Sequence, residues 1–257
     1  MSASLWDKTH PSEDESGNTK LLYGATNTGQ TRTHNEDAFF MDDHIWVVTD
    51  GMGGHNAGEV ASQKTITYIK ENLSIQQLSE LNVPDNQLLS RTLFGAHLEI
   101  IRLSQENPEY RGMGCTVVIA SLLGSTLHVC HVGDARAYIV NADKIQQIGT
   151  DHSHVAEAVL AGQMTRDEAR LSDMKNLVTQ AIGGPNELHP EYLTAQVNPN
   201  DRILLCSDGL WDMLSDEEIK NLIMADDDAQ HITQQLISEA NRAGGLDNIT
   251  VIMAIVH

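Results

Sequence analysis

Carboxylates stand beside turns at several places along this chain. Three of them, Asp50, Asp134 and Asp208, directly follow short apolar segments. The full set is Asn35-Glu36-Asp37, Thr49-Asp50-Gly51, Gly133-Asp134, Ser207-Asp208-Gly209 and Leu246-Asp247-Asn248. A single Asp-Gly pair is often only a turn former, because its carboxylate accepts hydrogen bonds from nearby backbone N–H groups. Turn formation does not explain the repetition, so we expect these carboxylates to gather at one edge of a pair of sheets.

Carboxylates gathered in this way need a counter-charge. Two of them about 4 Å apart repel by roughly 4 kcal/mol at an effective dielectric of about 20, so the cluster requires bound cations or protonation. All-oxygen ligation without clustered Cys or His favours magnesium or manganese over zinc or copper. Two such ions can share a bridging water, lower its pKa and hold a hydroxide for attack. This chemistry predicts hydrolysis of phosphate esters.

A phosphate substrate also needs a cationic group, and the chain has only 16 Lys and Arg residues. Arg32 lies shortly before Glu36 and Asp37. Its planar guanidinium can bind two phosphate oxygens at once. Standing alone, Arg32 would be interpreted as an exposed turn residue. Beside these carboxylates it is predicted to bind the substrate phosphate.

The elements that position these residues follow from the pattern of apolar residues. Short apolar segments rich in branched residues and bounded by Gly, Asp or Asn predict strands, and longer segments with helical spacing predict helices. The predicted strands are 45–49, 116–123, 126–132, 135–140, 202–206 and 249–256. The predicted helices are 58–73, 86–105, 155–162, 216–224 and 229–242.

The connections between strands predict an α+β fold. Only Gly124-Ser125 and Gly133-Asp134 separate the strand segments between residues 116 and 140, which leaves no room for helical crossovers, so these neighbours should pair antiparallel. We expect antiparallel sheets covered by helices rather than a doubly wound parallel sheet. Residues 150–184 are polar, helical and interrupted, and predict a flap over a sheet edge.

Composition limits the class of protein. At 257 residues and 40% apolar content, one compact domain is expected, spanning 19–257 after a flexible acidic segment at 1–18. The 36 Asp and Glu residues outnumber the 16 Lys and Arg residues, and the resulting net charge of −20 repels nucleic acid and anionic lipid. Cys115, Cys130 and Cys206 lie in apolar runs, as buried thiols do. Without a secretory or membrane-spanning segment, we expect a cytoplasmic monomer.

Seven motifs, in order, resemble the PPM family of metal-dependent protein serine/threonine phosphatases, the phosphatase-2C-like group, in its bacterial branch. The matching segments are 32–37, 50–54, 112–116, 132–136, 151–153, 207–210 and 247–250. No single segment is decisive. The ordered set covers nearly the whole chain from about residue 20 onward.

The resemblance implies a four-layer α-β-β-α sandwich of two mainly antiparallel sheets flanked by helices, with a helical flap insertion. It also implies two central Mn²⁺ or Mg²⁺ ions and a third, weaker site. The ligands of the central ions would be Asp37, Asp50, Asp208 and Asp247, with the backbone carbonyl of Gly51. Asp134 and Asp208 would form the third site, Glu36 would orient metal-bound water, and Arg32 would bind the substrate phosphate. Asn248 would steady Asp247.

Three histidines bear on the proton donor and the flap. Eukaryotic relatives carry a histidine directly after the Asp-Gly pair, where this chain has Met52. His55 titrates near neutrality and is a candidate general acid, although a histidine in a glycine-rich turn is more often a solvent-exposed polar residue. His152 and His154 have a spacing that suggests zinc in isolation, but the Asp151-His152-Ser153 motif favours a structural role in the flap.

The resemblance implies phosphorylated proteins as substrates, including a cognate Ser/Thr kinase and its targets, with no nucleic-acid or membrane partner. Two alternatives compete with the phosphatase reading. One is a catalytically inactive phosphoprotein-binding regulator of the same fold, which the complete acidic set and Arg32 argue against. The other is a calcium-stabilised protein, which the absence of a twelve-residue calcium loop argues against. The glycines at 51–54 lack the Lys-Ser/Thr of a nucleotide-binding loop.

Overall fold

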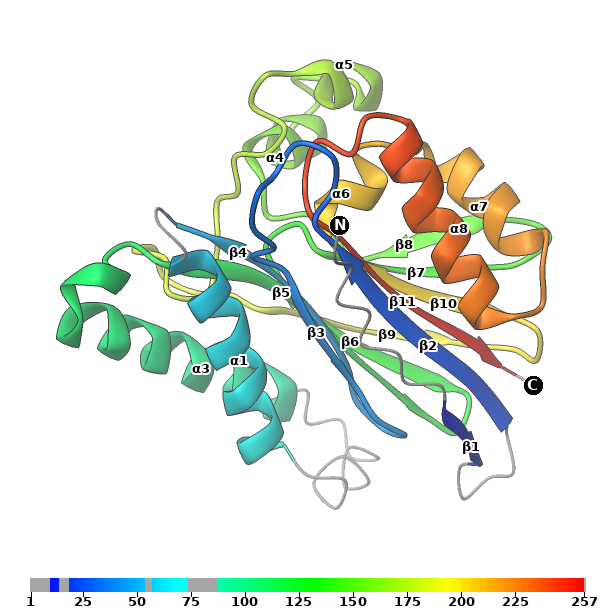
Figure 1. Cartoon of the computed structure of the whole chain (residues 1–257), viewed down its shortest axis with the longest axis horizontal. Coiled ribbons are helices and arrows are strands. Elements are labelled where there is room, and N and C mark those ends of the chain that lie inside the picture. Colours follow the sequence, from blue (N-terminus) through cyan, green and yellow to red (C-terminus); the bar gives the residue numbers. More distant parts are fainter. Residues whose placement is uncertain (1–9, 14–18, 54–56, 74–86, 257) are drawn as a thin grey trace.

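The computed structural model describes residues 10–13, 19–53, 57–73 and 87–256. In this part of the chain two β-sheets lie face to face (Figure 1). The first sheet has the order β1 (His10–Glu13), β2 (Thr19–Asn27), β11 (Ile249–Val256), β10 (Arg202–Cys206), β7 (Arg136–Val140) and β8 (Ile145–Ile148). The second has the order β3 (Ala38–Met41), β4 (Trp46–Met52), β5 (Gly114–Leu123), β6 (Thr126–Val132) and β9 (Glu191–Gln196). Neighbouring strands in both sheets pair antiparallel.

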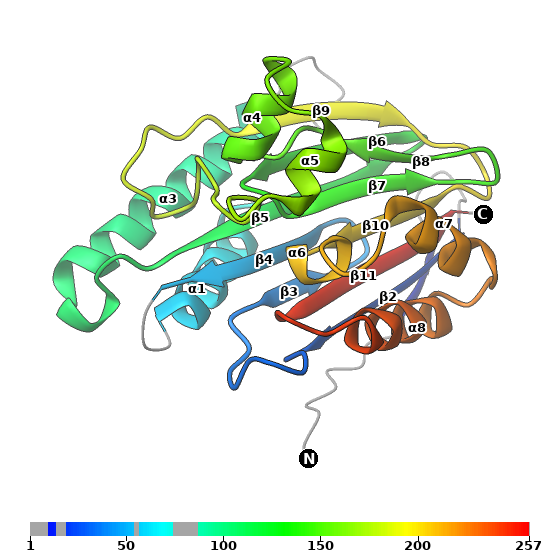
Figure 2. The same ribbon diagram turned by 90° about the horizontal axis from the view of Figure 1, so that it is seen from above.

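Helices cover the outer face of each sheet. α1 (Ala57–Asn72) and α3 (Gln87–Glu106) pack on the second sheet, and α7 (Asp216–Met224) and α8 (Ala229–Arg242) pack on the first (Figures 1 and 2). α7 begins with a reciprocal cap, in which the Ser215 hydroxyl accepts from the Glu218 N–H and the Glu218 carboxylate accepts from the Ser215 N–H. The predicted four-layer α+β sandwich is confirmed.

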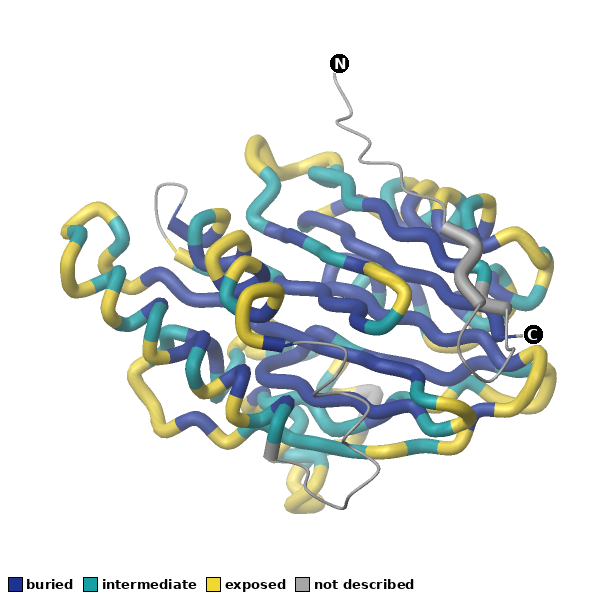
Figure 3. The backbone as a smooth tube through the Cα atoms, turned by 90° about the horizontal axis from the view of Figure 1, so that it is seen from below, coloured by how far each residue is buried: buried dark blue, intermediate teal, exposed yellow. Residues whose placement is uncertain are grey.

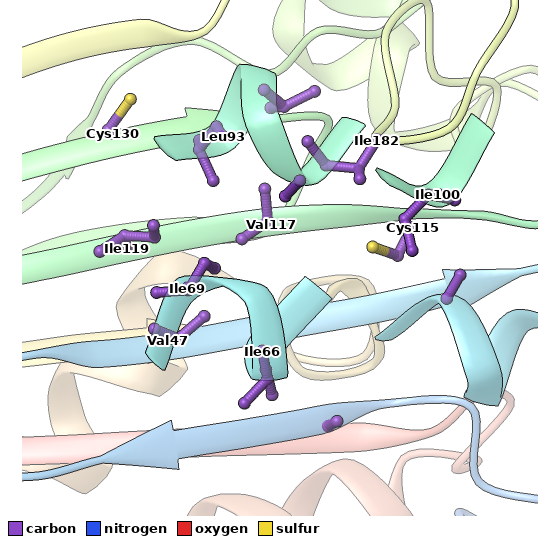
Figure 4. Close-up of a cluster of buried hydrophobic side chains, with 14 of the residues drawn as sticks. Val47, Ile66, Ile69, Leu93, Ile100, Cys115, Val117, Ile119, Cys130 and Ile182 are labelled. Carbon is purple, nitrogen blue, oxygen red and sulfur yellow. The ribbon is translucent and has the colours of Figure 1, made fainter. Parts of the chain in front are cut away.

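On the central strands, apolar side chains alternate between the two faces. On β4, Val47 packs toward α1 and α3, whereas Trp46 and Val48 pack between the sheets. Figure 4 shows Val47 beside Ile69 and Val117 in the outer cluster. A third cluster fills the space between the first sheet, α7 and α8. Figure 3 shows the strands buried along most of their length, with the exposed positions concentrated in loops and on helix faces.

The three cysteines are free and buried, as expected from their apolar surroundings. Burial raises the pKa of the Cys115 and Cys130 thiols to about 12. These thiols therefore remain protonated near neutral pH and contribute packing rather than reactivity.

The chain crosses between the sheets after β6. β5 and β6 pair antiparallel, as predicted, but the prediction that the next strand continues this hairpin is wrong, because β7 pairs with β10 and β8 in the other sheet. Gly133 has a φ of 92°, a conformation that favours glycine. This turn redirects the chain at Gly133-Asp134 and leaves Asp134 buried near the ends of both sheets.

Residues 10–13 form β1, inside the segment 1–18 that was predicted to be flexible. β1 pairs with β2 at the edge of the first sheet. Pairing at a sheet edge is made through backbone groups, so it requires no apolar alternation that the sequence would reveal. β2, β3, β8 and β9 were also not predicted.

The segment 150–184, predicted to be a flap and called the flap below, contains α4 (His154–Leu160) and α5 (Arg166–Leu171). It projects beyond the strand ends near the short helix α6 (Asp208–Trp211) (Figures 1 and 2). Lys175 Nζ lies 2.5 Å from Oδ1 of Asp212 and ties the flap to the residue that follows α6. Within the described ranges, no helix is long and apolar enough to cross a bilayer.

Candidate active site

Strand ends from both sheets meet at one edge of the sandwich. Antiparallel pairing places Cys206, at the end of β10, opposite Val251 near the start of β11, and Asn27, at the end of β2, opposite Ile249. In the second sheet, Asp50 pairs with Thr116, which contacts the turn at Gly133. The topology thus gathers the segments 28–37, 50–51, 133–134, 207–208 and 247–248.

Asp37 lies at the centre of this edge and is buried. Its Oδ2 accepts hydrogen bonds from the Ser207 and Thr250 hydroxyls, each at 2.7 Å. Thr250 Oγ1 is in turn 2.7 Å from Thr26 Oγ1, so strands of the first sheet hold the carboxylate in one orientation. Asp37 Oδ1 is buried and has no hydrogen-bond partner among the described residues.

Asp50, which is half-buried, and Asp208, which is buried, complete the group. Burial raises the pKa of both carboxyls well above 3.8, and the charges of neighbouring Asp residues raise it further. Burial also raises the pKa of Asp37 to about 6, against the hydrogen bonds that lower it. Asp208 Oδ1, like Asp37 Oδ1, is a buried oxygen without a partner in the described part of the chain.

These unpartnered oxygens fit a divalent cation. Buried carboxylate oxygens that make no hydrogen bond carry a desolvation penalty, and hard cations prefer oxygen ligands of this kind. A cation would also remove the mutual repulsion that keeps protons on the cluster at neutral pH. The donor set is therefore suited to Mg²⁺ or Mn²⁺.

Asp134 lies on the flap side of the cluster. Burial, followed by the charge of Asp151, raises its pKa to about 7, although Arg136 acts in the opposite direction. The charge of Asp134 raises the pKa of both Asp50 and Asp208, so the three carboxyls interact electrostatically. The Trp211 indole donates to the Asp134 carbonyl at 3.1 Å and fixes the turn that carries it.

Arg32 lies at the exposed rim. One of its terminal nitrogens is 2.7 Å from Oδ2 of Asp247, and the two side chains are 52% and 26% exposed. Arg32 is therefore open to solvent while it remains attached to the carboxylate cluster. This is the placement that docking of an incoming phosphate requires.

Asn248 organises the loop that carries Arg32 and Glu36. Its Oδ1 accepts from the Glu36 N–H at 2.8 Å, and its Nδ2 donates to the carbonyls of Thr28 and His34 at 2.9 Å. Its own N–H donates to Oδ1 of Asp247 at 2.8 Å. Asn248 thus links the Arg32 loop, through its side chain, to the Asp247 carboxylate, through its backbone N–H.

Gly51 stands where the backbone is crowded. Its N–H donates to the Glu36 carbonyl at 3.2 Å. A Cβ at Gly51 would lie 2.3 Å from the carbonyl oxygen of Gly58 and 2.6 Å from that of Glu36, so only glycine fits. Burial raises the pKa of Glu36, although the charge of Arg32 opposes the shift. His55, the candidate general acid, lies outside the described residues.

A second group of metal-type side chains lies at the base of the flap. Ligand atoms of His131, His152 and Glu191 lie within 4.8 Å of one another. They already bond to protein groups: His131 Nε2 is 2.8 Å from Glu191 Oε2, which also accepts from the Thr150 N–H, and His152 Nδ1 accepts from the Gly133 N–H. Burial and the neighbouring His131 lower the pKa of His152 to about 4. These contacts anchor the flap, whereas His154 is exposed.

Sequence reasoning missed the residues that support the carboxylates. Ser207, Thr250 and Trp211 each bond directly to Asp37 or to the Asp134 backbone. Ser207 and Thr250 lay inside motifs that pointed to the neighbouring carboxylates, but their spacing carried no signal of a shared partner. Arg136 binds Asp151 through both of its carboxylate oxygens and stacks on Trp211.

Comparison with known proteins agrees with this geometry. The family profile described as Protein phosphatase 2C matches residues 26–245. The chain belongs to the protein phosphatase 2C family. Protein phosphatase PhpP of Streptococcus pneumoniae is 34% identical to this phosphatase over 243 residues, which is 90% of this chain and 96% of PhpP.

Solved structures give the same result. The serine/threonine phosphatase PstP/Ppp of Mycobacterium tuberculosis superposes with a TM-score of 0.84 at 31% identity, covering 92% of this chain and 98% of PstP/Ppp. A structure of the PstP catalytic domain in complex with two manganese ions superposes with a TM-score of 0.80 at 30% identity, covering 93% of this chain and 99% of that one. This phosphatase 2C is a protein serine/threonine phosphatase.

Proposed function

We propose that this phosphatase 2C hydrolyses phosphoserine and phosphothreonine in proteins by direct displacement, with two divalent ions held at the carboxylate edge. Asp37, Asp50, Asp208, Asp247 and the Gly51 carbonyl would hold the central ions, and Asp134 with Asp208 a third. The observation that carries the proposal is the pair of buried, unpartnered oxygens, Asp37 Oδ1 and Asp208 Oδ1. Mn²⁺ or Mg²⁺ suits these oxygens, and PstP was solved with manganese.

The bound ions would supply Lewis acidity and a bridging hydroxide as the nucleophile. The residues of the chain would position the reactants. Arg32 is exposed enough to exchange part of its contact with Asp247 for two oxygens of the substrate phosphate. Glu36 would orient the attacking water. A solvent molecule or His55 would protonate the serine or threonine oxygen that leaves.

Two features of the site support direct displacement. The thiols beside it, Cys115 opposite Gly51 and Cys206 before Ser207, are both fully buried. Arg32 and the ions would stabilise the charge that develops on the equatorial phosphate oxygens. Acid-quenched enzyme, after turnover of a ³²P-labelled phosphoprotein, should carry no label; labelled enzyme would contradict direct displacement.

We further propose that residues 19–257 act as a single catalytic unit in the cytoplasm, as a monomer, on a cognate Ser/Thr kinase and its substrates. The kinship with PhpP and PstP/Ppp supports phosphoprotein substrates. The test is removal of phosphate from the autophosphorylated kinase of the same cell. A kinase that retains its phosphate while other phosphoproteins lose theirs would contradict this partner.

The experiment that tests the function is hydrolysis of a phosphothreonine peptide in EDTA, Mg²⁺, Mn²⁺ or Ca²⁺, by wild type and Asp50→Asn. We expect turnover with Mg²⁺ or Mn²⁺, none in EDTA, and little in the variant. Equal turnover in EDTA would contradict a metal-dependent reaction. Metal binding without turnover of any phosphoester would instead favour a phosphoprotein-binding regulator.

A further inference from the structure

A cavity of about 470 Å³ lies between the flap and the segment that joins α6 to α7. Val155, Val159 and Leu160 of α4 form an apolar wall, and Trp211 lies on the α6 side. Leu160 is 73% exposed. The cavity is thus open to solvent and has an apolar side without a function in the reaction described above.

The cavity borders the carboxylate edge. Trp211 lies on the same short helix as Asp208, and its indole donates to the Asp134 carbonyl at 3.1 Å. A polypeptide whose phosphorylated residue reaches Asp208 and Arg32 would therefore place a nearby side chain over this cavity. The position fits a specificity pocket for the residues that flank the phosphorylated one.

Two of the three basic residues that line the cavity are held in ion pairs. Arg136 is bound to Asp151 at 2.6 Å, and Lys175 is bound to Asp212 at 2.5 Å. Arg170 lies near Glu218, whose pKa it helps to lower after the Ser215 hydrogen bonds. Apart from Arg170, which is exposed, the cations that line the cavity are therefore already paired with protein carboxylates.

Two acidic groups of the cavity have no basic partner. Asp216 and Glu217 are exposed in the first turn of α7, and neither makes an ion pair with any residue that the structure describes. Acidic residues also stabilise the first turn of a helix, so their presence has a structural role as well. They also line a cavity that has an apolar side. Such a cavity can bind a long basic side chain, with its aliphatic stem on the apolar side and its charged head at the carboxylates.

We infer that this cavity binds a lysine or arginine side chain near the phosphorylated residue of the substrate protein. The inference rests on the proposed function and names the class of substrate: phosphoserine or phosphothreonine segments with a neighbouring basic residue. The net charge of −20 favours basic partners generally. Asp216 and Glu217 convert that general attraction into selection at one position of the substrate.

The test uses phosphothreonine peptides that differ only in one residue, placed at successive positions on either side of the phosphothreonine. The residue is lysine, norleucine, which keeps the stem without the charge, or glutamate. At one position we expect kcat/KM for lysine to exceed that for norleucine about fivefold to tenfold. The preference should shrink as ionic strength rises.

Asp216→Asn/Glu217→Gln should remove this preference, with kcat/KM expressed relative to hydrolysis of p-nitrophenyl phosphate by the same protein. Asp43→Asn/Asp143→Asn is the matched control, because both residues are exposed in turns at the opposite ends of their strands and the net charge changes equally. The control should keep the lysine preference. Circular dichroism checks that each variant is folded. If the double variant is unfolded, Glu217→Lys replaces it in the test, and this variant should prefer the glutamate peptide.

The outcomes separate the two hypotheses. The proposed pocket would be contradicted if wild type had equal kcat/KM for all peptides. It would also be contradicted if the Asp216/Glu217 variants kept the same lysine preference as the control. Neither result would contradict the proposed phosphatase function. Failure of wild type to hydrolyse any phosphopeptide or p-nitrophenyl phosphate with Mn²⁺ would overturn the proposed function itself.

Discussion

Thr250 and Asp37 lie 213 residues apart, yet the Thr250 hydroxyl donates a 2.7 Å hydrogen bond to Oδ2 of Asp37. Ser207 donates to the same oxygen. These two bonds leave Oδ1 as the only oxygen of Asp37 with no bond in the described part of the chain. The fold thus fixes the carboxylate before any metal binds.

Thr250→Val should weaken metal binding. The substitution keeps the shape of the side chain but removes a hydrogen bond that orients a ligand, and loss of such support typically weakens metal affinity roughly tenfold or more. The Mn²⁺ concentration for half-maximal turnover should rise accordingly, with activity recovered at high Mn²⁺. Thr233→Val is the control, because the Thr233 hydroxyl is buried without a partner among the described residues. Coincident Mn²⁺ curves for Thr250→Val and wild type would contradict this role.

Metal stabilisation should grow with pH. In the metal-free protein, burial is the main cause that raises the pKa of Asp37 to about 6 and of Asp134 to about 7, from 3.8 when unfolded. The folded state therefore holds protons that the unfolded state has lost, and its stability falls as pH rises from about 4 to about 7. Divalent ions replace those protons, so the difference in Tm between Mn²⁺ and EDTA should increase over this range. In EDTA, Asp208→Asn should reduce the fall in Tm as pH rises. A Tm difference between Mn²⁺ and EDTA that does not change with pH would contradict this prediction.

Arg32→Lys should reduce activity on phosphopeptides while the fold is kept. Lysine retains the charge but loses the planar fork, and a charge-assisted hydrogen bond contributes about 1.5–3 kcal/mol. We expect kcat/KM to fall roughly tenfold to a hundredfold. Arg102→Lys is the control, because Arg102 makes forked contacts to Glu99 and Glu106 on α3, away from the site. Similar kcat/KM values for Arg32→Lys and wild type would remove Arg32 from phosphate binding.

Arg136→Met should destabilise the protein strongly. Arg136 and Asp151 are 17% and 10% exposed, and removing one partner of a buried pair leaves an uncompensated charge that costs about 3–5 kcal/mol. Urea unfolding measures the loss. Arg242→Met, which breaks a surface pair with Glu239, should cost less than about 1 kcal/mol. Equal losses of unfolding free energy in the two variants would show that the Arg136–Asp151 pair contributes no more to stability than a surface pair.

The gathering of the carboxylates could be predicted because strand ends and turns have recognisable local sequence patterns. Asp50 and Asp208 follow apolar strands and precede glycine, and both lie in the carboxylate group at this edge of the sandwich. Strands 126–132, 202–206 and 249–256 were predicted at their observed bounds, since continuous branched apolar residues mark buried strands.

The sequence could not predict contacts that depend on long-range pairing. Gly133-Asp134 is compatible with a hairpin or a crossing between sheets, and only the partners of β7 decide which forms. β2 includes Gly24, Thr26 and Asn27, and β9 is only partly buried, so neither shows a clear apolar pattern. Ser207 and Thr250 become partners of Asp37 only once β10 and β11 pair.

The most direct test is to measure Mn²⁺ binding and phosphothreonine-peptide hydrolysis on the same samples of wild type, Asp208→Asn and Asp143→Asn. Equilibrium dialysis gives the number of tightly bound ions. We predict that wild type and Asp143→Asn bind Mn²⁺ and turn over in proportion to it, whereas Asp208→Asn loses tightly bound Mn²⁺ and roughly a hundredfold or more of its turnover. Asp208→Asn that binds and hydrolyses like wild type would contradict the assignment of this carboxylate edge as the metal-dependent catalytic centre.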